Sequence, residues 1–173
     1  MNGIREIVTK AVVGKGKKII RLTSLVTPSN EPFSVLGCWV INHEFEGSLI
    51  DGNKVGINGS FEINIWYAYD NNTKTEVARK IVTYEDVIKT RQIVSDVTNG
   101  TKDVIIRVLQ QPTCTNAKIE ENGIEVEIIF EVVGEIIGET KMLVTVFQNN
   151  EIVDSADDDD FENEINENFI KTN

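Results

Sequence analysis

Two stretches of the chain alternate apolar and polar side chains with a period of two, and this pattern limits the fold more than any other feature. Residues 61–69 carry apolar side chains at every odd position, and residues 124–132 carry them at every even position. Successive side chains of a strand point to opposite faces, so each stretch predicts a half-buried β-strand. The glutamates of residues 125–131 then face water.

Turn residues separate these stretches from further strand-like segments. The sequence DNN at 70–72 predicts a turn, because Asp and Asn tolerate left-handed backbone, and residues 73–84 then return as the second strand of a hairpin. The glycine-containing segments 13–19 and 134–138 are also interpreted as breaks between strands. Additional strands are expected at 4–13, 17–26, 34–44, 53–59, 86–97, 103–111 and 139–146.

No segment shows a sustained helical stripe. Many short strands with turn residues between them predict an all-β fold, an antiparallel β-sandwich or a barrel-like body. Residues 58–82 and 122–144 share a weak similarity in the order strand, turn, strand, so the body over 1–150 is divided into possible halves 1–99 and 100–150. Residues 151–173 are expected to form a separate acidic tail, disordered or partly helical.

The charge of the chain is concentrated in this tail. The formal net charge is −11, and residues 151–173 hold nine acidic side chains and one lysine, a balance of −8 that leaves −3 for the body. Nucleic acids and anionic membranes carry the same sign, so neither is expected as a partner. The tail is either solvated or forms one amphipathic helical face on a partner, through Phe161, Ile165, Phe169 and Ile170.

No apolar run approaches the ~20 residues that span a bilayer, and the first residues lack the apolar core of a secretory signal. The protein is therefore expected to begin in the cytosol, without membrane insertion. In a reducing compartment Cys38 and Cys114 are expected to be buried thiols, able to cross-link if the environment becomes oxidising.

The sequence offers little that supports catalysis. His43 is the single histidine, and because neighbouring residues of a strand face opposite ways, His43 and Glu44 do not easily share one metal ion. The segment VGKGKKI lacks the glycine spacing and the Ser or Thr of a phosphate loop. We therefore expect no enzyme activity, no metal and no cofactor.

Two features favour contacts with other molecules. A basic cluster on an otherwise acidic protein can receive the acidic tail of another copy; it consists of Lys15, Lys17, Lys18 and Arg21. Trp66 lies on the polar face of its strand with Glu62 and Asn64, where a tryptophan is either covered by a loop or anchors an interface. We favour the interface. The alternative is a carbohydrate- or small-ligand-binding β-sandwich that uses Trp66 as a stacking platform.

Six strings in order, REIVTKAVVGKGKK, LGCWVINHEFEG, EINIWYAYDNNTKTEV, YEDVIKTR, VLQQPTC and GETKMLV, closely resemble the spore coat protein E family of outer-coat morphogenetic proteins. The resemblance covers residues 3–147 by motif and the remainder by composition. It implies a non-catalytic scaffold made in the mother-cell cytoplasm, which assembles around the forespore as a large homo-oligomer in the outer coat and recruits other coat proteins.

The resemblance also implies where these activities lie. Localisation through a basement-layer coat protein would fall within residues 58–75. Client binding would fall within 151–173, for which we select Asp157, Asp158, Asp159, Asp160, Phe161 and Phe169. Self-association would fall near residues 4–13, for which we select Ile4, Ile7, Thr9, Ala11 and Val13. An all-β body agrees with such a scaffold, because unpaired backbone groups on edge strands can be completed by another copy.

Overall fold

The computed structural model describes residues 3–94, 97 and 99–147, and within them the regular secondary structure is entirely β. The prediction of an all-β protein is confirmed, whereas the predicted tail, residues 151–173, lies outside the described residues. The strands are β1 (Gly3–Val26), β2 (Ser34–Asp51), β3 (Lys54–Tyr69), β4 (Lys74–Lys89), β5 (Arg91–Gln92), β6 (Asp103–Glu120) and β7 (Gly123–Val146).

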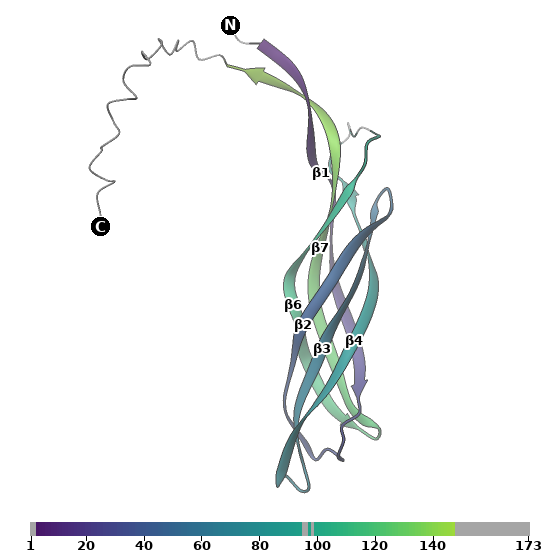
Figure 1. Cartoon of the computed structure of the whole chain (residues 1–173), viewed down its shortest axis with the longest axis vertical. Helices are drawn as coiled ribbons and strands as arrows, with labels where there is room; N and C mark the ends of the chain where they lie inside the picture. The colour runs from purple at the N-terminus through teal and green to yellow at the C-terminus, as the bar shows by residue number, and fades with distance from the viewer. Residues whose placement is uncertain (1–2, 95–96, 98, 148–173) are drawn as a thin grey trace, which may run out of the picture. The chain divides into compact units, whose positions relative to one another are not determined.

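The strands form two antiparallel sheets (Figure 1). One sheet has the order β5-β1-β7-β6 and the other the order β2-β3-β4. Strands from both predicted halves share the first sheet, and the duplication itself stays a prediction. The chain divides into one compact unit over residues 7–142 and a second that includes residues 3–6 and 143–147. All features below lie in the first unit unless stated otherwise.

The predicted hairpin over residues 61–84 is confirmed as β3 and β4. The two strands pair without a register shift from Lys54 opposite Lys89 to Tyr69 opposite Lys74. Asp70, Asn71 and Asn72 adopt positive φ angles of 52°, 51° and 64°. These three residues close the turn because Asn and Asp accept this backbone region at lower cost than most side chains.

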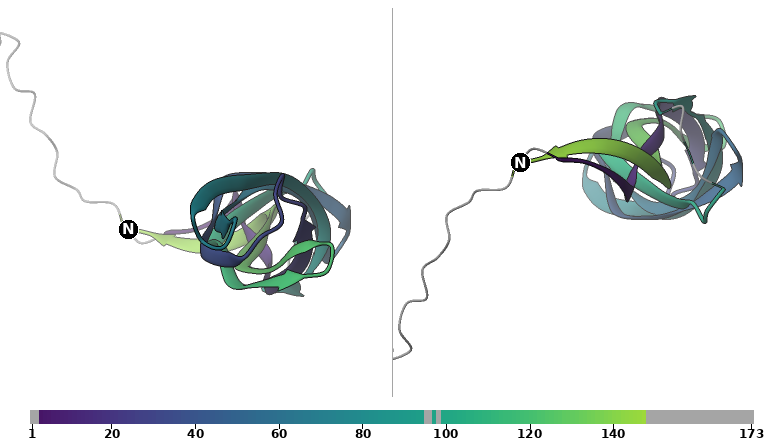
Figure 2. Two further views of the ribbon diagram at one scale, coloured as in Figure 1. Left: turned by 90° about the horizontal axis from the view of Figure 1, so that it is seen from below. Right: turned by 90° about the horizontal axis from the view of Figure 1, so that it is seen from above.

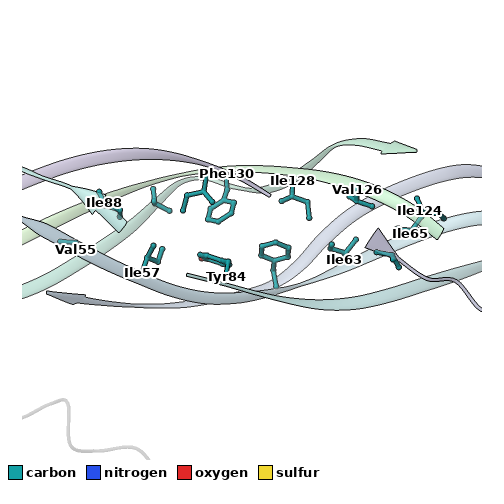
Figure 3. Close-up of a cluster of buried hydrophobic side chains, with 14 of the residues drawn as sticks. Val55, Ile57, Ile63, Ile65, Tyr84, Ile88, Ile124, Val126, Ile128 and Phe130 are labelled. Carbon is teal, nitrogen blue, oxygen red and sulfur yellow. The ribbon is translucent and has the colours of Figure 1, made fainter. Parts of the chain in front are cut away.

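The core lies between the two sheets. The apolar positions of residues 61–67 and 124–132 are buried to 1% exposure or less and face each other across the interior (Figure 3). Figure 2, which views the body along its length, shows the strands of both sheets arranged around this interior. Phe61, Tyr84 and Phe130 form its aromatic centre, with ring centroids 5.0–6.2 Å apart. The alternation read from the sequence therefore gives the two inner faces of the sandwich.

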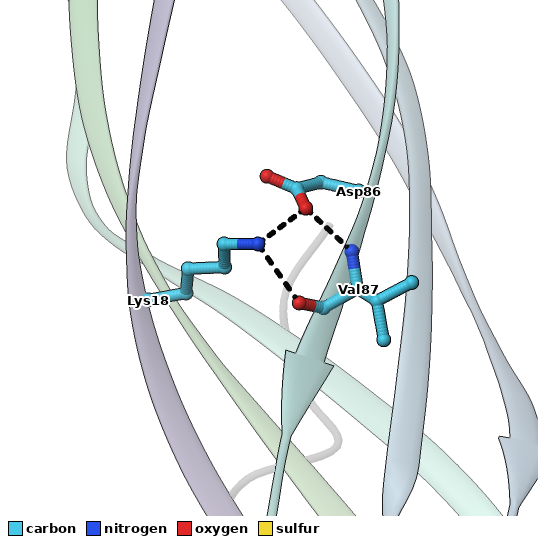
Figure 4. A network of polar contacts seen from close by, with 3 residues as sticks. All are labelled: Lys18, Asp86 and Val87. Carbon is cyan, nitrogen blue, oxygen red and sulfur yellow. Dashed lines mark hydrogen bonds and ion pairs between the residues drawn. The ribbon is translucent and has the colours of Figure 1, made fainter.

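Side chains connect β1 to β4 although the two strands belong to different sheets. Lys18 of β1 forms an ion pair with Asp86 and donates a hydrogen bond to the Val87 carbonyl oxygen at 3.0 Å (Figure 4). The Val87 N–H in turn donates to Asp86 Oδ1 at 2.7 Å. Further along, Lys80 Nζ donates to the Leu25 carbonyl oxygen at 2.7 Å. Lysine side chains thus connect the two sheets on this side of the sandwich, where β1 and β4 are not paired through their backbones.

Two predicted breaks are wrong. Residues 13–19 and 134–138 lie inside the continuous strands β1 and β7. Their glycines serve close packing instead of turns: a Cβ on Gly16 would stand 2.0 Å from the Lys89 carbonyl oxygen. Glycine inside a strand often marks such an approach of a second backbone. The same glycines that resemble a turn in the sequence let β1 pass against the end of β4.

We expect Gly16→Ala to destabilise the protein by about 2 kcal/mol or more, because the added methyl group meets backbone that cannot rotate away. Urea unfolding followed by tryptophan fluorescence measures this difference. Gly52→Ala is the matched control, since a Cβ at Gly52 meets nothing within 4 Å. Equal unfolding midpoints for the two variants would contradict the close-approach interpretation.

Candidate functional site

The outer face of the β2-β3-β4 sheet carries both tryptophans of the chain. Trp66 on β3 lies opposite Gly37 on β2 and Val77 on β4, and Trp39 on β2 lies one row further along, opposite Asn64. Trp39 and Trp66 are 42% and 45% exposed. A strand places these outward residues opposite to the buried ones, so the core and this surface result from the same alternation.

Three further apolar side chains extend this surface. Ile41 of β2 lies opposite Glu62, and Glu62 lies opposite Ile81 of β4, which is 70% exposed. We call the surface the tryptophan face; its members are Trp39, Ile41, Trp66, Val77 and Ile81. Exposed apolar surface between polar groups is typical of protein interaction sites. Tryptophan in particular anchors interfaces, because it buries a large rigid area.

The alternation of residues 61–69 correctly predicts that Trp66 is exposed, but Trp39, Ile41 and Ile81 were not predicted as members of this face. A signal for two of them was present in LGCWVI at residues 36–41, where apolar residues occupy both faces of one strand. Such a run indicates either a strand buried on both sides or an exposed apolar face. The alternative function, binding of a carbohydrate or small ligand on Trp66, stays a prediction. Trp66 lies among the side chains of an exposed sheet surface.

His43 links the two sheets from a bulge in β2. The register of β2 on β3 shifts between Ile41 and Glu44, and Asn42 has a φ of 54°, so the ring of His43 turns toward the interior. His43 Nε2 lies 2.6 Å from the hydroxyl oxygen of Tyr84, and Nδ1 lies 3.4 Å from Gln111 Oε1. The ring also packs at 5.4 Å from that of Phe130.

The surroundings set the protonation of this pair. Burial raises the pKa of Tyr84 to about 12, so its hydroxyl stays protonated and can donate a hydrogen bond to Nε2. Burial also lowers the pKa of His43, against a smaller raising effect of Gln111. A neutral ring with its proton on Nδ1 satisfies both partners. Within residues 3–94, 97 and 99–147, no group of three His, Cys, Asp or Glu side chains is placed to hold a metal.

The predicted basic cluster is divided between two sides of β1. Lys15 and Lys17 point outward and pair with Glu135 at 3.1 Å and Glu131 at 2.7 Å, whereas Lys18 reaches β4. Arg21 is exposed. Lys15 and then Arg107, which is 2.7 Å from the carboxylate, hold the pKa of Glu135 below its usual value.

A hollow beside these ion pairs gathers cationic side chains from four strands. We call it the basic groove, and its charged lining consists of Lys15, Lys17, Lys89, Arg91 and Arg107. Glu131 and Glu135 offset two of these five charges, which leaves a balance of +3 among the named groups. The basic groove can therefore still attract an acidic segment.

The residues selected for self-association differ in exposure. Ile4 and Ile7 are 75% and 37% exposed, Thr9 and Ala11 are half-buried, and Val13 lies in the core at 4% exposure. Ile4 belongs to the second unit, whose described residues also expose Leu143 and Phe147, each at 73%. The selected tail residues, Asp157 to Phe161 and Phe169, lie outside the described residues.

The family model for outer spore coat protein E (CotE) matches residues 3–172, nearly the whole chain. The chain belongs to this family. Membership supports a structural role in the outer spore coat and agrees with the resemblance found from the sequence motifs. Comparisons with curated proteins and with solved structures give no match. In the part of the chain that the structure describes, no helix has the length and apolar character needed to cross a membrane.

We expect the free energy of unfolding to fall as the pH drops from 7.5 to 5.5. Folding lowers the pKa of His43 from its ordinary 6.5, so the unfolded chain binds more protons in this range and acidification favours unfolding. The expected loss is about 1 kcal/mol or less. Urea unfolding at both pH values measures it.

His43→Gln should remove most of this pH dependence, because the chain holds no other histidine. Glu135 does not interfere, since its ordinary pKa is 4.5 and folding lowers it further. An unchanged pH dependence in the variant would assign the effect to another group.

Proposed function

We propose that the protein is a non-catalytic scaffold of the spore outer coat, which assembles with copies of itself around the forespore and recruits other coat proteins. Family membership supports the outer-coat role. The observation that carries self-assembly is the tryptophan face, where five exposed apolar side chains occupy neighbouring strands of one sheet. We propose that this face contacts a second copy of the chain.

The geometry of the sheets favours contact through a face over the addition of a strand at an edge. The border of β4 lies against β1, joined by Lys18 and Lys80, and the border of β2 lies beside β6. An added strand needs free backbone groups and space along an edge. The exposed Ile4 and Ile7 at the start of β1 remain a second proposed contact.

We propose that the protein acts first in the mother-cell cytoplasm and then in the outer coat, with a basement-layer coat protein directing its position. Residues 58–75, to which the family resemblance assigns localisation, include most of β3 and the turn to β4. Trp66 lies within this segment, so the tryptophan face overlaps the surface proposed for localisation. A contact with one partner would then limit contact with the other.

The double substitution Trp39→Ser and Trp66→Ser should weaken self-association by about tenfold or more, since buried tryptophans often contribute most to an interface. Light scattering over a range of protein concentrations measures the change. Ile105→Ser is the matched control, because Ile105 is similarly exposed at 46% but lies on β6 of the other sheet.

Assembly equal to wild type in the tryptophan variant, with its fold intact by circular dichroism, would reject the tryptophan face as the contact. The ligand-binding alternative makes a different prediction. A stacking platform would give saturable binding of an oligosaccharide to the monomer, and Trp66→Ser alone would abolish this binding.

We further propose that the acidic tail recruits client proteins and does not hold the scaffold together. Removal of residues 151–173 should then leave folding and self-association unchanged while client binding is lost, because a solvated segment contributes little to the core. Light scattering and a pull-down with purified coat proteins separate the two effects.

Loss of assembly on truncation would instead indicate that the tail bridges copies through the basic groove. In that case assembly of the full chain would weaken between low salt and about 0.5 M salt, where the Debye length is shorter than at physiological ionic strength. Arg91→Gln would reproduce the effect, since Arg91 lines the groove.

A further inference from the structure

Cys38 and Cys114 point into the same interior from different sheets. Cys38 of β2 lies directly opposite Ile65, and Cys114 of β6 lies directly opposite Ile128. Side chains of directly opposed residues share a face of the sheet, and both isoleucines are buried to 1% exposure or less. Both cysteines are free thiols that pack partly buried against the core.

Contacts along the border of β2 and β6 place the two cysteines at the same level. A Cβ on Gly47 would lie 2.7 Å from Ile106, and His43 Nδ1 lies 3.4 Å from Gln111 Oε1. Position numbers on β6 rise as those on β2 fall, so the two strands run antiparallel here. If the same alignment continues from His43 to Cys38, Cys38 lies near Cys114 on β6.

The thiols themselves interact. Cys114 is close enough to Cys38 to affect the pKa of its thiol, and Cys114 Sγ donates a hydrogen bond to the Asn116 carbonyl oxygen at 3.4 Å. Burial raises the pKa of Cys38 above its ordinary value, and the neighbouring Cys114 raises it further. The Cys38 thiol is therefore held protonated, which slows but does not prevent its reaction, because thiolate is the reactive form.

We propose that Cys38 and Cys114 form an intrachain disulfide that joins β2 to β6 when a low-molecular-weight disulfide is present. One protein thiolate attacks a sulfur of the reagent, whose S–S bond breaks and releases one reagent thiolate. The second protein thiolate then attacks the cysteine Sγ of this mixed disulfide, forms the Sγ–Sγ bond and expels the second reagent thiolate. Two electrons pass to the reagent, and the two protons from the protein thiols complete its two released thiols.

This bond would join the two sheets covalently along a border where they do not share a backbone ladder. It would close a long loop that contains β3, β4 and β5, and such a cross-link stabilises mainly by restricting the unfolded chain. The inference goes beyond the scaffold function, since it depends only on the placement of the two thiols within one chain.

The test uses the full chain, purified reduced and then incubated with oxidised glutathione at about pH 8.5, where more of each thiol is ionised. Mass spectrometry should show a monomer that has lost the mass of two hydrogen atoms, and peptide mapping should link Cys38 to Cys114. The thermal midpoint of the oxidised monomer should exceed that of the reduced one by about 5–15 °C.

Cys38→Ser and Cys114→Ser are the matched controls. Each variant should stop at the mixed disulfide with glutathione and show no comparable rise in thermal midpoint. The proposal is overturned if both wild-type thiols still react with an alkylating agent after oxidation and denaturation. It is also overturned if they carry glutathione separately, or if the linked peptides come from different chains.

Discussion

The contact among Phe61, Tyr84 and Phe130 decides how the two sheets meet. These rings come from β3, β4 and β7, and the closest pair of centroids is 5.0 Å apart. Aromatic pairs at such distances add to the free energy already gained by burial. The border contacts follow from this packing: His43 can reach Tyr84, and Lys18 can reach Asp86, only because the core sets the spacing of the sheets. The side-chain contacts at the two borders of the sandwich therefore depend on the aromatic packing at its centre.

Periodicity in the sequence predicted the inner faces of the sandwich well, because burial on one side of a strand leaves a period of two. The turn at Asp70–Asn72 was also predicted, since its residue types match the left-handed backbone that the turn requires. Gly16 shows where such reasoning fails. Glycine is used both in turns and where another backbone comes close, and only the position of Lys89 in space distinguishes these uses.

The turn wrongly predicted at 13–19 also explains why the basic cluster is divided between two sides of β1. A turn at 13–19 would allow Lys15, Lys17 and Lys18 to point in one direction, whereas a continuous strand sends Lys18 to the opposite side. The aromatic signal was more reliable, because Trp66 lies in a strand whose pattern is unambiguous. Trp39 was not predicted because the strand around it is apolar on both faces. Its position beside Asn64 depends on the register between β2 and β3, which the local sequence does not encode.

Side chains of β3 point alternately to the core and to the outer face, and this alternation limits how the sequence of the strand can change. Substitutions at Trp66 or its outward neighbours change the exposed surface, while the inward residues keep the core intact. Insertion of a single residue into the strand would affect both faces, since it would exchange the outward residues beyond the insertion with the inward ones. A point replacement on the outer face can thus change the exposed surface alone, whereas a change of length inside the strand alters the surface and the core together.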